Sequence, residues 1–305
     1  MRTFLGLVSI LAVTACGPTP TRGDGTTDAQ PTPDSTVQPP SDGDPGPGCQ
    51  AIDVLFVIDN SGSMGQEQTN LIANFPSFIS VLDQSGLDYR VAVTTTGRDY
   101  TYTMASPLGP IAMSQDGGDN GAMLKTPAMT RRWLEKADAD VTGTFQALAN
   151  VGTGGPSDEM PLSAMRDAFE ERIADGTNAG FHRPDALLAI VFLTDEEDCS
   201  YEQSVTLSFT QSLCDAQMEP VANYVTFLDQ YTGNRTRWAV AAIAGMGPGA
   251  CSSDFGSADE ATRLKQFVQQ TGANANMSSI CEGDLAGGLM QALDLFESAC
   301  GGILL

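Results

Sequence analysis

Short oxygen-bearing side chains gather directly after a near-continuous apolar stretch of the sequence. Asp59, Ser61 and Ser63 follow residues 52–58 on a turn that also contains Gly62. A carboxylate and two hydroxyls on a tight turn supply the compact oxygen ligands that Mg²⁺ prefers, and glycine lets that turn bring both hydroxyls to one side. The pattern therefore predicts a divalent-cation site. A Ser/Asp cap for the next helix is the structural alternative, and it is compatible with metal binding.

A second carboxylate follows another apolar stretch. Asp195 comes directly after residues 186–194, and three further acidic residues follow it, Glu196, Glu197 and Asp198. If both apolar stretches are neighbouring parallel strands, their carboxyl ends lie at the same edge of a sheet. Asp195 is therefore expected beside Asp59, in a strongly acidic environment.

The elements that position these residues alternate along the chain between strands and helices. Near-continuous apolar runs are typical of strands covered on both faces of a parallel sheet, and apolar residues at helical spacing follow them. Strands alternating with helices predict an α/β fold, with a mainly parallel sheet and helices on both faces. The expected strands are residues 52–58, 90–96, 186–194 and 237–244, and the expected helices are 65–84, 217–231, 257–270 and 285–299.

The order and separation of the two acidic motifs resemble the metal-ion-dependent adhesion site of von Willebrand factor A (vWA) domains. The resemblance covers most of residues 51–300, although 97–150 and 198–216 are longer or less patterned than a minimal domain. It is closest to bacterial vWA-domain lipoproteins. It implies a Rossmann-like vWA fold in which Asp59, Ser61 and Ser63 surround the cation and Asp195 contributes a second carboxylate.

The middle loop departs from the family pattern, which places a threonine just ahead of a helix. A helix is expected to start near Pro161, because proline suits the first helical turn. Counting back from it puts Glu159 near the threonine position, and Thr153 and Ser157 are the alternatives. A third carboxylate would tighten metal binding but would neutralise the ion, which weakens its attraction for an acidic group on a partner.

The resemblance implies a binding module, not an enzyme. Its cofactor would be a divalent cation, Mg²⁺ first, with Mn²⁺ or Ca²⁺ as alternatives, and its partner a protein whose acidic side chain completes the coordination. Two alternatives stand: an envelope scaffold whose metal site is vestigial or merely stabilising, and a metal-assisted hydrolase. The single histidine, His182, is expected on a surface loop away from the site, and no G-x-S-x-G motif is present, which argues against a serine hydrolase.

The amino-terminal residues predict export and lipid anchoring. Residues 1–15 have the pattern of a secretory signal, and the stretch ending at Cys16 resembles the lipobox of bacterial lipoproteins. Residues 16–48 are rich in Pro, Gly and Asp and predict an extended tether, followed by one domain over 49–305. Gly17, in place of the Asp that retains lipoproteins in the inner membrane, favours the outer membrane, facing periplasm or medium. The formal charge of -23 argues against nucleic acid and against charge-driven binding to anionic lipid.

Six further cysteines in an exported chain predict disulfides, although six cysteines allow 15 connectivities. The fold implied by the resemblance narrows them. It places Cys49 and Cys300 together at the sheet end opposite the metal, Cys199 and Cys214 beside the acidic loop, and Cys251 and Cys281 on the same rim. A thiolate metal site is the competing interpretation, but the sequence contains no C-x-x-C.

Overall fold

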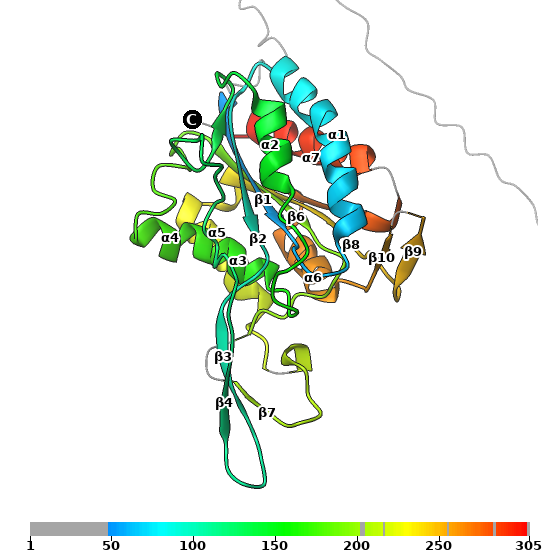
Figure 1. Cartoon of the computed structure of the whole chain (residues 1–305). Helices are drawn as coiled ribbons and strands as arrows, with labels where there is room; N and C mark the ends of the chain where they lie inside the picture. Colours follow the sequence, from blue (N-terminus) through cyan, green and yellow to red (C-terminus); the bar gives the residue numbers. More distant parts are fainter. Residues whose placement is uncertain (1–47, 202–204, 216, 255, 283–284, 304–305) are drawn as a thin grey trace, which may run out of the picture. The chain divides into compact units, whose positions relative to one another are not determined.

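A six-stranded sheet lies at the centre of the computed structural model, in the order β11-β8-β6-β1-β2-β5 (Figure 1). All neighbouring pairs are parallel except β2 and β5. The strands are β1 (Ala51–Ile58), β2 (Asp88–Thr95), β5 (Leu134–Glu135), β6 (Leu187–Leu193), β8 (Trp238–Ala244) and β11 (Ala275–Ser279). The structure describes residues 48–201, 205–215, 217–254, 256–282 and 285–303, so the expected signal peptide, Cys16 and almost all of the tether lie outside it.

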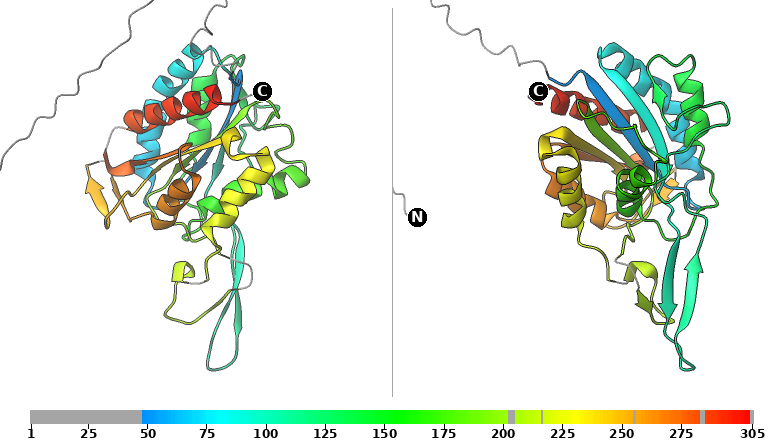
Figure 2. Two further views of the ribbon diagram at one scale, coloured as in Figure 1. Left: turned by 180° about the vertical axis from the view of Figure 1, so that it is seen from behind. Right: turned by 90° about the vertical axis from the view of Figure 1, so that its left-hand side faces the viewer.

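Helices cover both faces of this sheet (Figures 1 and 2). One face packs against α1 (Gly65–Gln84), α2 (Val141–Ala149) and α7 (Leu285–Gly301), and the other against α3 (Pro161–Phe169), α5 (Val221–Thr232) and α6 (Thr262–Thr271). Every residue of β1, β6 and β8 is buried. Because side chains alternate between the faces of a strand, these continuous apolar runs fill both layers of the core. The expected mainly parallel α/β sheet with helices on both faces is confirmed.

Most element boundaries agree with the expectation from the sequence, and two differ. The expected helix 257–270 starts later, because Gly256–Ala258 forms β10 and pairs antiparallel with β9 (Cys251–Ser253). The expected helix 217–231 begins only at Val221, after Pro220. The remaining short elements are α4 (Glu171–Ala174) and the 3₁₀ turns η1 (Leu213–Asp215), η2 (Arg235–Arg237) and η3 (Ile280–Glu282).

The less patterned segments of the sequence form a projecting arm. Strands β3 (Tyr100–Met104) and β4 (Ile111–Gln115) make an antiparallel hairpin, and β7 (Thr206–Leu207) pairs with the other side of β3. Figures 1 and 2 show the arm extending from the end of the sheet at which β2 terminates. The sequence did not predict this arm.

Three disulfides join the cysteines in the pairs that the proposed fold favours. Cys49 bonds to Cys300, with Cα atoms 5.0 Å apart, and the other bonds are Cys199–Cys214 and Cys251–Cys281. The first bond ties the start of β1 to the end of α7. Disulfides of this kind are typical of proteins that fold in an oxidising compartment. Within the described ranges, no helix has the length and apolar character that crossing a membrane requires.

Candidate functional site

Four loops meet at the carboxyl-terminal edge of the sheet. The parallel register pairs Ile58 with both Thr95 and Leu193, so the residues that follow these strands lie side by side. The backbone continues the ladder there: Asp59 N donates to Leu193 O at 2.9 Å, and Thr96 N donates to Ile58 O at 3.1 Å. The ends of β1, β2 and β6 therefore deliver Asp59, Thr96 and Thr194 to one place.

Asp59 is fully buried at the centre of this edge. Its Oδ1 accepts a hydrogen bond from Ser61 N at 2.7 Å, and its Oδ2 accepts one from the Thr194 hydroxyl at 2.5 Å. Burial raises its pKa, and these hydrogen bonds only partly oppose the rise. The hydroxyls of Ser61 and Ser63 lie 3.1 Å apart, so the turn does bring both to one side.

Glu159 enters the same site from the loop that precedes α3. Its side chain is fully buried; Oε2 accepts a hydrogen bond from the Thr96 hydroxyl, while Oε1 has no hydrogen-bond partner among the described residues. Burial, reinforced by the negative charge of Asp59, raises its pKa to about 9. The helix begins at Pro161 as expected. The other two residues considered for this position, Thr153 and Ser157, are exposed on the same loop.

Asp195 supplies the third carboxylate. It is 3% exposed, and its Oδ1 lacks a hydrogen-bond partner in the part of the chain that the structure describes. Burial raises its pKa to about 6; a hydrogen bond from Ser63 opposes this, and the charges of Asp59 and Glu67 add to it. A cavity of about 190 Å³ adjoins it, lined by Ser63, Asp195, Glu196, Ala250, Ser257, Ala258 and Asp259.

One acidic residue of the site was missed in the sequence. Glu67, in the first turn of α1, is 2% exposed, its Oε2 has no partner among the described residues, and burial together with the charge of Asp59 raises its pKa. It packs against Gly256 of β10, where a Cβ atom would collide with the carboxylate and where φ is +133°. A glutamate in a first helical turn ordinarily signals only favourable interaction with the helix dipole. Its place in the site depends on the packing of β10 against it, which the sequence around Glu67 does not indicate.

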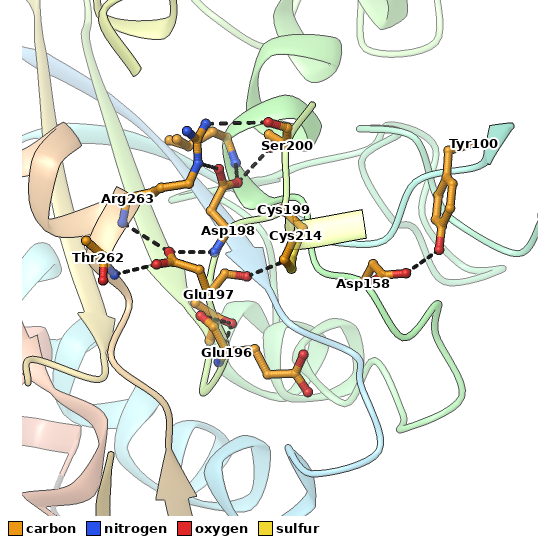
Figure 3. The surroundings of a disulfide bond; sticks show 12 residues. Tyr100, Asp158, Glu196, Glu197, Asp198, Cys199, Ser200, Cys214, Thr262 and Arg263 are labelled. Atoms are coloured by element: carbon orange, nitrogen blue, oxygen red, sulfur yellow. Dashed lines mark hydrogen bonds and ion pairs between the residues drawn. A yellow bond between two sulfur atoms is a disulfide. The ribbon is translucent and has the colours of Figure 1, made fainter. Parts of the chain in front are cut away.

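The acidic residues after β6 have different surroundings (Figure 3): two of them hold helices in place and one does not. Glu197 accepts hydrogen bonds from the backbone N–H groups of Thr262 and Arg263, at 2.9 and 3.0 Å, and so caps α6. Asp198 accepts from Leu162 N at the start of α3 and forms an ion pair with Arg263 at 2.8 Å. These two carboxylates hold helices in place, whereas the side chain of Glu196 extends away from them and its pKa is raised to about 7 by burial and by Asp59.

The carboxylates of the site differ from buried carboxylates elsewhere in the protein. Buried Asp53, Asp167 and Asp198 each form an ion pair with an arginine, with Arg183, Arg98 and Arg263 respectively. Within the described ranges, Asp59, Glu159 and Asp195 have no Lys, Arg or His within 4.0 Å, and Glu159 and Asp195 each retain a buried oxygen without a donor. Uncompensated buried carboxylates are costly, and a bound cation removes that cost. Their oxygen atoms are of the type that divalent cations take; among the described residues these three carboxylates are not gathered within 4.8 Å of one another.

Two other groups do not form sites. Asp158 lies beside the sulfur atoms of Cys199 and Cys214, but these sulfurs are bonded to each other and are not free thiolates. His182 precedes β6, at the amino end of the strand as expected, but it is not a freely exposed loop residue. It is half-buried against Tyr231, with ring centroids 5.4 Å apart, and burial lowers its pKa to about 4. The packing of α5 against this loop explains the difference.

Comparison with known proteins gives structural similarity only. No protein-family model and no curated protein matches the sequence. The fold is similar to proximal thread matrix protein 1 from the mussel byssus, at 12% identity and a TM-score of 0.43, and to the pilus adhesin SpaC from Lactobacillus rhamnosus GG, at 12% identity and 0.44. Each match covers 81% of this chain, but only 49% and 31% of the respective proteins, so the chain spans half of their length or less. Similarity at this level does not extend to function.

Proposed function

We propose that the folded part of this chain, residues 49–305, is a vWA-like binding module that works through a divalent cation. The observation that carries the proposal is that three carboxylates from three separate loops at one edge of the sheet, Asp59, Glu159 and Asp195, are buried without an ion pair in the described structure. The negative charge of such a cluster is removed either by protonation, as the raised pKa of Glu159 indicates, or by a bound cation.

The ligand set would combine these carboxylates with the hydroxyls of Ser61 and Ser63. Oxygen ligands alone favour Mg²⁺, with Mn²⁺ or Ca²⁺ as alternatives. The cation would supply a positive charge that attracts an acidic side chain of a protein partner. Thr194 orients Asp59 through a hydrogen bond, and Thr96 does the same for Glu159. With Glu159 as a third carboxylate, the net attraction for an acidic partner would be weaker than in a site with a hydroxyl there.

The proposal extends to where the module works. We infer an exported protein, anchored through a lipid on Cys16 and held on a tether over residues 16–48, in the outer membrane facing periplasm or medium. The three disulfides support export, since such bonds persist in oxidising compartments. The formal charge of -23 disfavours attraction of the protein surface to anionic lipid, so contact with the membrane would depend on the lipid at Cys16.

A second candidate is a scaffolding lipoprotein in which the cation only stabilises the fold. The same unpaired buried carboxylates favour it, because a cation that neutralises them stabilises the domain whether or not a partner binds. The two candidates differ in one respect: the binding module requires the cation for partner binding, and the scaffold does not.

Titration calorimetry tests the proposal. Mg²⁺, Mn²⁺ and Ca²⁺ are titrated into the purified chain, into Asp59→Asn and into Asp88→Asn. Asp88→Asn is the matched control, because it also removes one carboxylate, but at the first residue of β2, where the side chain is 64% exposed. Saturable binding by the wild type and by Asp88→Asn, with loss in Asp59→Asn, is expected. Absence of binding by the wild type for all three cations would contradict the cation-dependent module.

A further inference from the structure

The arm formed by β3 and β4 carries most of the exposed large apolar side chains in the described part of the chain. Leu108 at its tip is 100% exposed, Ile111 and Met113 on β4 are 45% and 40% exposed, and Phe209 beside β7 is 64% exposed. The arm is too thin to bury them itself, because residues 111–114 are exposed on both faces of the hairpin. Several exposed large apolar side chains on one small sheet and its turns are typical of an interaction surface.

The outer edge of β4 is also free to form backbone hydrogen bonds. The small sheet has the order β4-β3-β7, so β4 has a neighbour on one side only within the described ranges. Natural proteins block such edges with charged residues, prolines or bulges. Ile111–Gln115 contains neither a charge nor a proline, and the five residues pair in continuous register with β3. This edge is therefore open to another strand.

The distribution of charged residues indicates that the strand that pairs with β4 belongs to a second copy of this protein. The chain has a formal charge of -23, yet the sixteen residues from Tyr100 to Gln115 contain no charged side chain. Two copies of so acidic a protein repel each other over most of their surfaces, and an uncharged arm that projects from the body is where they can meet without opposing carboxylates. The edge is also its own complement, since antiparallel pairing of two identical strands creates a two-fold interface.

We propose that this protein self-associates through its arms, with β4 of one copy pairing antiparallel to β4 of a second copy. Centring the pair on Met113 lets all five residues of both strands overlap, with Met113 opposite its own equivalent and Ile111 opposite Gln115. Asp116 then lies opposite Pro110, so no carboxylate faces another across the pair. The contact is small, which makes it a weak and reversible association. It is independent of the cation site.

Charge reversal at the centre of the pair tests this pairing. Sedimentation of the full chain is measured over a range of concentrations, so that a weak association is followed at equilibrium. The wild type is expected to associate, and Met113→Lys or Met113→Glu in both copies is expected to lower the association constant several-fold, because like charges face each other. Met113→Lys in one copy with Met113→Glu in the other is expected to restore it. Met113 is exposed, so thermal melts of the single variants should match the wild type.

Cysteine cross-linking tests the register. Met113→Cys is expected to form a disulfide-linked dimer under mild oxidation, because directly opposed residues of antiparallel strands lie within reach of a disulfide. Leu108→Cys is the matched control, since it is more exposed but lies opposite Gly118 in this register. A wild type that sediments as a monomer at every concentration, association insensitive to charge at position 113, or equal cross-linking at 108 and 113 would each overturn the proposal.

Discussion

Replacing Glu159 with glutamine is expected to stabilise the metal-free protein at neutral pH, although it removes a proposed ligand. In the folded protein the pKa of Glu159 is about 9, whereas its ordinary value is 4.5. The folded state therefore holds a proton at pH 7 that the unfolded chain has released. A raised pKa of this kind gives stability that is complete below pH 4.5 and falls as the pH rises toward 9.

The size of the effect depends mainly on the ordinary pKa. Folding at pH 7 protonates Glu159, although this pH lies about 2.5 units above the ordinary pKa of 4.5. At 1.36 kcal/mol per unit, this lowers the free energy of unfolding by about 3 kcal/mol. At pH 5 the same group costs only about 1 kcal/mol. Glutamine is neutral at every pH and avoids both costs. Glu159→Gln should therefore gain about 2.5 kcal/mol more over the wild type at pH 7 than at pH 5.

Urea unfolding in EDTA at pH 5, 6 and 7, with the disulfides intact, measures this gain. Glu170→Gln, at a side chain that is 63% exposed next to α3, is the control for loss of one exposed carboxylate. Adding Mg²⁺ should reverse the order, because the wild type is stabilised by binding and Glu159→Gln much less. A free-energy difference between Glu159→Gln and the wild type that is the same at pH 5 and pH 7 would refute the reasoning.

Two further predictions concern the stability of the domain, and a third concerns the support of the site. Arg263→Met should lower the free energy of unfolding by about 3–5 kcal/mol, because it leaves buried Asp198 unpaired; chemical denaturation measures it, and a loss below about 1 kcal/mol would argue against the ion pair. Replacing Cys49 and Cys300 together by serine should cost about 5 kcal/mol, since this bond closes a loop of 251 residues; an unchanged melting temperature would contradict it. Gln68→Ala should weaken Mg²⁺ binding in calorimetry, because Gln68 Nε2 holds the backbone oxygens of Asp59 and Gly152 together at 2.9 and 2.8 Å; unchanged affinity would show that the two loops hold their positions without it.

The sequence alone determined the layered core and the first turn of the site. β6 and β8 are continuous apolar runs and β1 is interrupted only by Asp53, a pattern typical of strands covered on both faces. The turn that starts at Asp59 follows its strand directly, so local order was enough to place it at the edge of the sheet. The disulfide pairs required one step more, because sequence permits many pairings and only a fold brings particular cysteines together.

Only the tertiary structure decided which acidic residues face the site. Glu196 and Asp198 are two residues apart in the sequence, yet Asp198 is occupied by Arg263 and by the start of α3, while Glu196 adjoins the cavity next to Asp195. Glu67 lies in the site because β10 packs over it, and no local pattern reports that packing.

The arm escaped prediction for a related reason. Strands are recognised in a sequence by the apolar faces that they bury, and β4 is exposed on both faces, so it leaves no periodic pattern. Its pairing with β3 depends on backbone hydrogen bonds, which any residue except proline can make. The sequence determined the elements that are buried, because burial requires a regular pattern of apolar residues. The tertiary structure decided the arrangement of the arm and of Glu67, because backbone pairing and packing between distant segments leave no such pattern.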